Sequence, residues 1–143
     1  MVDLESIRNL LASYSGTRII DLNGDVFAIH DPDGDLPPQR QIPWATIVTS
    51  NAHDSASDLD RPGVFRLNLG LTRNRYRELI DPAKDYDLTE LDVLLPHPDY
   101  GGQNWVCVLN LQRTWPLVRQ LLDEANAFAV RKYENTARRR HKQ

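Results

Sequence analysis

The stretch that decides the fold is TRIIDLNGDVFAIH, residues 17–30. It contains two apolar runs separated by the dipeptide Asn23-Gly24. Asparagine and glycine both tolerate the positive φ angles of a type I′ turn, which joins neighbouring antiparallel strands. The stretch therefore predicts a β-hairpin with strands over 17–22 and 25–30, and it indicates that the domain is built on an antiparallel sheet.

Three further segments have the composition of strands, over 45–50, 64–69 and 105–109. In the segment 64–69, Arg66 and Asn68 alternate with apolar residues, so they fall on the opposite face of the strand. This polar face is either exposed to solvent or, if the sheet curves over a cleft, forms its floor. In the second case Arg66 would bind an anion, because a guanidinium group suits carboxylate and phosphate.

Helices are predicted at both ends of the chain. Apolar residues at steps of three and four follow Asp3 and Thr114, and both of these residues are favourable helix caps. A short helix is expected over 72–80, and one or two further helical turns over 88–95. The order of elements predicts one α+β domain over residues 1–137, a single antiparallel sheet of about five strands with the N- and C-terminal helices packed on one face.

Composition and charge describe an ordinary domain with a basic end. The chain has 143 residues, of which 41% are apolar and 26% charged, a size typical of one domain. Its 17 Lys and Arg against 20 Asp and Glu give a net charge of −3. Residues 131–143 hold six Lys and Arg against one Glu, a charge of +5, so the preceding 130 residues carry −8. This excludes a uniformly basic nucleic-acid binder and sets residues 138–143 apart as a basic C-terminal tail.

The sequence also predicts a cytoplasmic location. No apolar run approaches the about 18 residues that a membrane-spanning helix needs, and the first residues are acidic, unlike those of a secretory signal. Cys107 is the only cysteine, so no intrachain disulfide can form. Nothing resembles a glycine-rich nucleotide fingerprint, and we expect no cofactor and no membrane partner.

Two blocks of residues carry a resemblance to known families. The block LPHPDYGGQNWVCV, residues 95–108, leads into a helix with a Val-x-x-Leu-Leu pattern at Val118–Leu122, and it resembles the end of the MmcQ/YjbR-like domains. The block Gly63–Gly70 is similar to a bacterial family of unknown function with the same order of elements. The resemblance implies a bacterial protein with a double-wing α+β fold, and the DNA-binding role that has been suggested for these families.

The segment 51–61 combines a histidine, serines and aspartates in a predicted loop, where function tends to concentrate. His53, Asp54, Asp58 and Asp60 could serve as nitrogen and oxygen ligands of a divalent metal ion, although their spacing matches no metal motif. A Ser-His-Asp arrangement would suit hydrolysis, but the sequence has no nucleophile elbow. The same side chains also close loops by binding nearby backbone N–H groups. We therefore assign no catalytic and no metal-binding residue.

A second loop places His97 between two prolines, shortly before Tyr100. The aromatic Trp105 opens a predicted strand and is interpreted as a core residue. Trp44 follows Pro43 at the entrance of another strand and is the best candidate for an exposed ring.

The absence of a catalytic motif favours a non-enzymatic domain that binds a small molecule or a protein. We expect its ligand between the loop at His53 and the loop at His97. The candidate ligand-binding residues are His53, Asp54, Ser55, Arg66, Asn68, His97 and Tyr100.

The alternative is nucleic-acid binding, which the acidic body disfavours. It would use Arg66 together with cations of the short helix and the tail, namely Arg73, Arg77, Arg138, Arg139, Arg140 and Lys142. A third interpretation is a metal-dependent or hydrolytic enzyme that uses the His53 loop.

Overall fold

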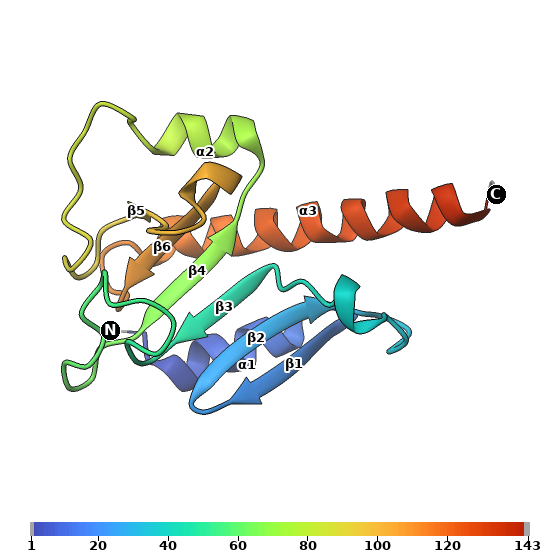
Figure 1. The fold of residues 1–143 in the computed structure, drawn as a ribbon, viewed down its shortest axis with the longest axis horizontal. Helices are drawn as coiled ribbons and strands as arrows, with labels where there is room; N and C mark the ends of the chain where they lie inside the picture. Colours follow the sequence, from blue (N-terminus) through green and yellow to red (C-terminus); the bar gives the residue numbers. More distant parts are fainter. Residues whose placement is uncertain (1, 142–143) are drawn as a thin grey trace.

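The computed structural model describes residues 2–141, which form three α-helices and six strands (Figure 1). The helices are α1 (Leu4–Ser13), α2 (Arg73–Leu79) and α3 (Trp115–His141). The strands are β1 (Thr17–Leu22), β2 (Asp25–His30), β3 (Ala45–Val48), β4 (Arg66–Gly70), β5 (Leu95–Pro96) and β6 (Trp105–Leu109). None of the helices in this part of the chain is long and apolar enough to cross a membrane.

The six strands form one sheet in the order β1-β2-β3-β4-β6-β5, and every neighbouring pair is antiparallel. The hairpin forms as predicted: Leu22 pairs with Asp25, and the turn residues Asn23 and Gly24 have φ angles of 53° and 87°. The two-residue strand β5 is the one strand that the sequence did not indicate. The predicted α+β fold with a single antiparallel sheet and terminal helices is confirmed.

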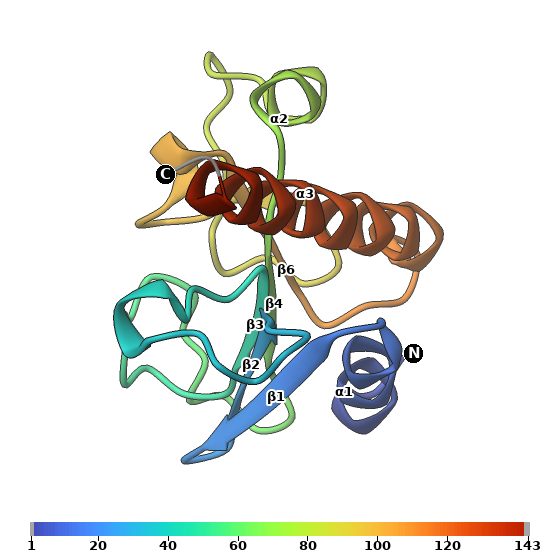
Figure 2. The same ribbon diagram turned by 90° about the vertical axis from the view of Figure 1, so that its right-hand side faces the viewer.

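One face of the sheet forms the apolar core with the helices. Cross-strand pairing aligns Val26, Ile47, Leu67 and Val108 in a row that crosses β2, β3, β4 and β6. All four are buried in one cluster with apolar side chains of α1 and α3. Figure 2 shows α1 on this side of the sheet. Burial of each such side chain stabilises the fold by about 1.5–3 kcal/mol. Most of the buried apolar residues belong to this cluster, so this face provides most of the hydrophobic stabilisation.

The opposite face is covered by loops. The neighbouring row in the same strands is Phe27, Thr46, Asn68 and Cys107. Successive side chains of a strand point to opposite faces, so this row points away from the helices. The segments that follow β2 and β3 lie on this side of the sheet in Figure 2. Arg66 is 1% exposed and Asn68 2%, so the hypothesis of a solvent-facing polar face is wrong.

The expected helical turns over 88–95 do not form: the segment has turns at 88–89 and at Asp92, whose φ angle of 58° is not that of a right-handed helix, and tertiary contacts hold it in this path. The backbone N–H of Asp92 donates to the carbonyl of Leu109 at 2.7 Å. The Asp92 carboxylate accepts hydrogen bonds from the backbone N–H groups of Gln112, Arg113 and Thr114 at 2.8–3.0 Å. The Asp92 carboxylate therefore provides hydrogen-bond acceptors for the backbone N–H groups just before α3 and in this way fixes the start of the helix.

Trp44 is also placed differently from the expectation of an exposed ring. Its N–H donates to the carbonyl of Ala28 and its own carbonyl accepts from Gly70, so the residue is held within the sheet. The side chain then points into the core. Its ring is 4% exposed and meets the edge of Tyr14 with the centroids 5.1 Å apart.

Candidate functional site

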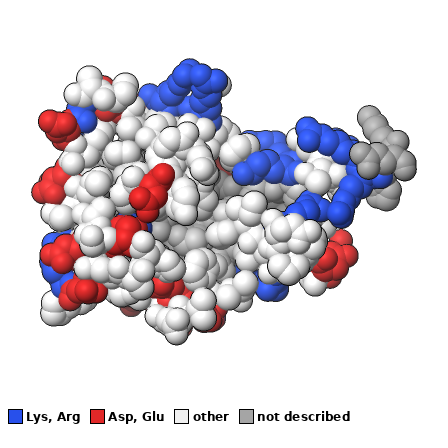
Figure 3. Space-filling view, viewed as in Figure 1, with Lys and Arg blue, Asp and Glu red and all other residues white. Residues whose placement is uncertain are grey.

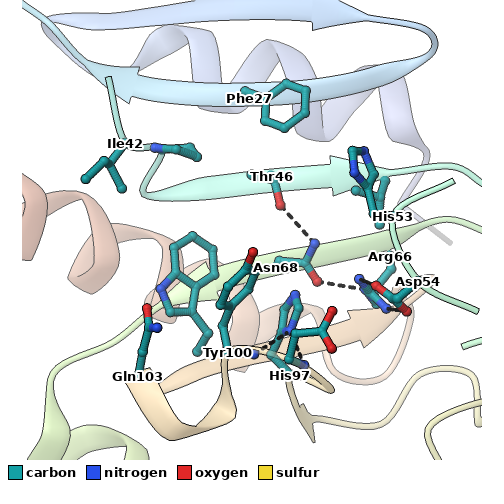
Figure 4. A pocket seen from close by; sticks show the side chains of 14 residues that line it. Phe27, Ile42, Thr46, His53, Asp54, Arg66, Asn68, His97, Tyr100 and Gln103 are labelled. Atoms are coloured by element: carbon teal, nitrogen blue, oxygen red, sulfur yellow. Dashed lines mark hydrogen bonds and ion pairs between the residues drawn. The ribbon is translucent and has the colours of Figure 1, made fainter. Parts of the chain in front are cut away.

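A cavity of about 420 Å³ lies on the loop-covered face of the sheet (Figure 4). The described chain brings six of the seven candidate ligand-binding residues to its lining: His53, Asp54, Arg66, Asn68, His97 and Tyr100. Ser55 is exposed and does not line the cavity. The loops at His53 and His97 therefore meet over one concave surface, as the leading interpretation requires.

Arg66 forms the buried end of the cavity floor and uses four of its five N–H donors in hydrogen bonds within the described chain. Its Nη1 and Nη2 atoms donate to the two carboxylate oxygens of Asp54 at 3.1 and 2.8 Å. Nη1 also donates to the hydroxyl of Ser57 at 2.9 Å, and Nε donates to Oδ1 of Asn68 at 2.9 Å. The hydrogen bonds from Arg66 hold the pKa of Asp54 below its usual value. The anion that Arg66 was expected to bind is thus already present as Asp54.

Asn68 continues this polar network along the floor. Its Nδ2 donates to the hydroxyl oxygen of Thr46 at 2.8 Å on the neighbouring strand. The two residues are directly opposite each other in the β3–β4 register. Figure 4 shows the resulting chain of contacts from Arg66 through Asn68 to Thr46. A buried network of this kind is stable only while each member keeps its partner.

The ring of His97 is buried beside the network and held by its own loop. Nδ1 accepts hydrogen bonds from the backbone N–H groups of Asp99 and Tyr100, both at 3.0 Å. An imidazole nitrogen that accepts carries no proton, so the proton of the neutral ring is on Nε2. Burial, and then the nearby positive charge of Arg66, lowers the pKa of His97 to about 4. The ring is therefore neutral at physiological pH.

His53 lies at the more open side of the cavity and is oriented by Asp25. Its Nε2 is 2.9 Å from Oδ2 of this buried carboxylate. The other oxygen of Asp25 accepts hydrogen bonds from the backbone N–H and the hydroxyl of Thr49 at 2.9 and 3.1 Å. In the tautomer that places the ring proton on Nε2, this N–H group donates to the Asp25 oxygen. The Asp25 contact therefore fixes the position of a histidine whose side chain is half exposed.

Aromatic and aliphatic side chains form the remaining wall. Tyr100 contacts His97 with ring centroids 4.9 Å apart, and both rings lie near Trp105 at 6.5 and 6.4 Å. Phe27 lines the cavity from β2. At the rim, Ile42 is 72% exposed and Tyr100 is 51% exposed, although both are large and apolar. The cavity thus has a polar floor and an apolar, aromatic wall.

The four aspartate and histidine side chains considered as metal ligands bind different partners. His53 contacts Asp25, and Asp54 contacts Arg66. Asp60 accepts from the backbone N–H and the amide group of Asn51, both at 3.1 Å, and Asp58 is 3.7 Å from Arg61. Within residues 2–141 no group of three or more His, Cys, Asp and Glu could hold a metal ion.

The residues proposed for nucleic-acid binding lie away from the cavity, except for Arg66. Arg73 and Arg77 are exposed on α2, and Arg138, Arg139 and Arg140 are exposed on α3, which continues to His141. Lys142 lies outside the described residues. In Figure 3, Lys and Arg gather over α2 and the last turns of α3, whereas Asp and Glu gather at the opposite end.

The candidate ligand-binding residues predicted from the sequence omit several residues of the site, among them Asp25, Phe27, Thr46 and Ser57. Strand alternation could have indicated two of them, because Phe27 and Thr46 fall in the same cross-strand row as Asn68. No local sequence pattern indicates Asp25 or Ser57. Their contacts with His53 and Arg66 form only when the loop over 51–61 folds onto the sheet.

The comparisons with known proteins place this architecture in a family. The model of a family described as "Family of unknown function (DUF6194)" matches residues 2–140. The chain belongs to this family. No curated protein and no solved structure matches the DUF6194 chain. The membership agrees with the predicted family of unknown function, while the finer resemblance to MmcQ/YjbR-like domains and the bacterial origin stay predictions.

Proposed function

We propose that this DUF6194 protein is a non-enzymatic domain that binds a small molecule in the cavity between the His53 and His97 loops. The observation that carries the proposal is the cavity itself, whose 420 Å³ lies in the range of about 300–1,000 Å³ typical of small-molecule sites. Its composition supports the same conclusion, since such sites combine an apolar wall with a few polar groups that orient the ligand.

The exposed apolar rim gives further support. Ile42 and Tyr100 are among the few large apolar side chains of residues 2–141 that are strongly exposed, and both lie at this cavity. A ligand seated there would remove apolar surface from water at about 25 cal/mol per Å². A cytoplasmic location belongs to the same proposal and is supported by the single, buried and unpaired Cys107.

The test is a metabolite screen by thermal shift on the full chain. We expect at least one compound to raise the melting temperature of the wild type, and the double variant His53→Ala/His97→Ala to lose this response. The control is Leu22→Ala, which removes an exposed leucine outside the cavity and should respond like the wild type. The proposal fails if no compound stabilises the wild type more than the double variant.

A second candidate function is binding of nucleic acid, favoured by the segregation of basic side chains in Figure 3. Arg73, Arg77, Arg139 and Arg140 take part in none of the ion pairs found within residues 2–141. Such a surface would bind phosphates with an affinity that falls steeply with salt. If duplex DNA and RNA show no retardation in a gel at low salt, this candidate is removed.

A further inference from the structure

We propose that the ligand of this cavity is an uncharged, planar molecule with a carbonyl-type oxygen, which accepts hydrogen bonds from Nε2 of His97 and Nδ2 of Asn68. The inference rests on the function proposed above and specifies the chemical class of the ligand. It follows from counting which hydrogen-bonding positions of the cavity floor are already used.

His97 contributes a donor. Its Nδ1 is occupied by two backbone N–H groups, so the Nε2–H group is the one polar position left on the ring. No described residue binds Nε2, and the residue lines the cavity. A ligand atom that meets this position must therefore accept a hydrogen bond.

Asn68 contributes a second donor, and its orientation is fixed by Arg66. The Nε atom of Arg66 can only donate, so the amide atom 2.9 Å away must be the oxygen Oδ1. The NH₂ group then points to Thr46, whose hydroxyl takes one of its two hydrogens. The second N–H remains for a ligand, because Asn68 also lines the cavity. Both open positions on these two side chains are thus donors.

The charges around the floor exclude a strongly charged ligand. The positive charge of Arg66 is neutralised by Asp54 at 2.8 Å, so the floor offers no free cation to an anionic ligand. Asp54 and the rim residue Asp99 would repel an anion. A cation would meet the N–H donors of His97 and Asn68, which offer it no acceptor. An uncharged acceptor such as a carbonyl oxygen avoids both costs.

The wall favours a planar ligand. Tyr100, Trp105 and the ring of His97 form one aromatic cluster, and Phe27 lines the cavity from another strand. Aromatic rings interact best in stacked or edge-to-face arrangements, so a flat ring fills such a space more completely than a branched aliphatic group. Figure 4 shows Tyr100, His97 and Phe27 around the polar floor.

Three bicyclic aromatic probes of similar size separate the possibilities. Coumarin carries a carbonyl acceptor and no donor, indole carries a donor and no strong acceptor, and naphthoate carries a negative charge. We expect coumarin to bind the wild-type chain more tightly than either of the others, as measured by chemical-shift titration. Equal or tighter binding of indole or naphthoate, or no binding of coumarin, would overturn the inference.

The variant His97→Asn tests the donor itself. An asparagine oxygen can replace Nδ1 as the acceptor of the two backbone N–H groups, but the side chain has no group in place of Nε2–H. Coumarin affinity should fall about fivefold, the value of one hydrogen bond, with indole affinity unchanged. The control His30→Asn changes a histidine outside this cavity and should leave both affinities as in the wild type. Unchanged coumarin affinity in His97→Asn contradicts the proposal.

A second readout needs no variant. The side-chain amide resonance of Asn68 in the wild type should move with coumarin and not with indole, and the opposite result would overturn the inference. The two proposals also fail differently. If the metabolite screen yields a charged ligand that His53→Ala/His97→Ala no longer binds, the binding function stands and the ligand class is wrong.

Discussion

The two faces of the same sheet differ in the chemistry of their buried side chains. Toward the helices, Val26, Ile47, Leu67 and Val108 form a dry apolar row. Toward the loops, the adjacent positions place Arg66 and Asn68 in a buried polar network. An apolar row tolerates exchange of one hydrophobic residue for another of similar volume. A buried polar network does not, because each lost partner leaves a group without its hydrogen bond.

This difference explains why the cavity lies on the loop-covered face. The row of Val26, Ile47, Leu67 and Val108 on the apolar face is covered by apolar side chains of α1 and α3. On the other face the polar network lies beside a smaller apolar cluster, and the loops that carry His53 and His97 leave the cavity open between them. The stability of the domain thus comes mainly from one face, and the proposed ligand site lies on the other.

The largest change in the free energy of unfolding should follow the removal of Asp54, the ion-pair partner of Arg66. The substitution Asp54→Ala leaves a guanidinium group that is 1% exposed without its countercharge, and should lower the free energy of unfolding by about 3–5 kcal/mol. Denaturant unfolding measures this. The double variant Asp54→Ala/Arg66→Met, which removes both charges, should recover a large part of the loss. A cost below about 1 kcal/mol for Asp54→Ala would show that the pair is not buried as described.

A smaller effect is expected from protonation of His97. Its pKa is about 4 in the folded chain and 6.5 in the reference state, so the unfolded chain binds the proton more readily. Stability from this residue is therefore full above pH 6.5 and is lost as the pH falls through 4, by about 3 kcal/mol in total.

The measurement is the stability of wild type and His97→Asn between pH 7 and pH 4. His30, whose pKa is also lowered by burial, contributes to the slope of both proteins, and the difference between them isolates His97. Asp54 loses its contribution only as it protonates at lower pH, because its pKa is depressed. Parallel curves for the two proteins would argue against a buried, neutral His97.

The smallest expected change in the free energy of unfolding comes from a comparison of two serines in the same loop. Ser57 is completely buried and accepts a hydrogen bond from Arg66, so Ser57→Ala should cost about 1–2 kcal/mol. Ser55 is exposed, and Ser55→Ala should change the free energy of unfolding by less than about 0.5 kcal/mol. Similar values for the two variants would mean that the loop does not cover Arg66.

The features that could be predicted from the sequence are those determined by residues close together in the chain. The turn at Asn23-Gly24 and the alternation around Leu67 follow from local backbone preferences, and both appear in the structure. The non-helical path at Asp92 could not be predicted in this way, because it depends on hydrogen bonds to residues that lie about 20 positions later.

The sequence predicted several of the residues that line the cavity, but not the contacts among them. His53, Arg66 and His97 were recognised as candidates from their loops and strand face, and they line one cavity. The burial of Arg66 depends on Asp54 and Ser57, which reach it from a loop whose path no local pattern indicates. The pairing of His53 with Asp25 spans 28 residues and is likewise a property of the folded chain.

We propose that the loop-covered face presents neutral hydrogen-bond donors to a ligand, and the protonation state of His97 decides whether this is so. The measurement is the ¹⁵N chemical shift of both ring nitrogens of His97 at neutral pH. We predict a neutral ring with its proton on Nε2 and a bare Nδ1. A proton on Nδ1, or a doubly protonated ring, would contradict the account.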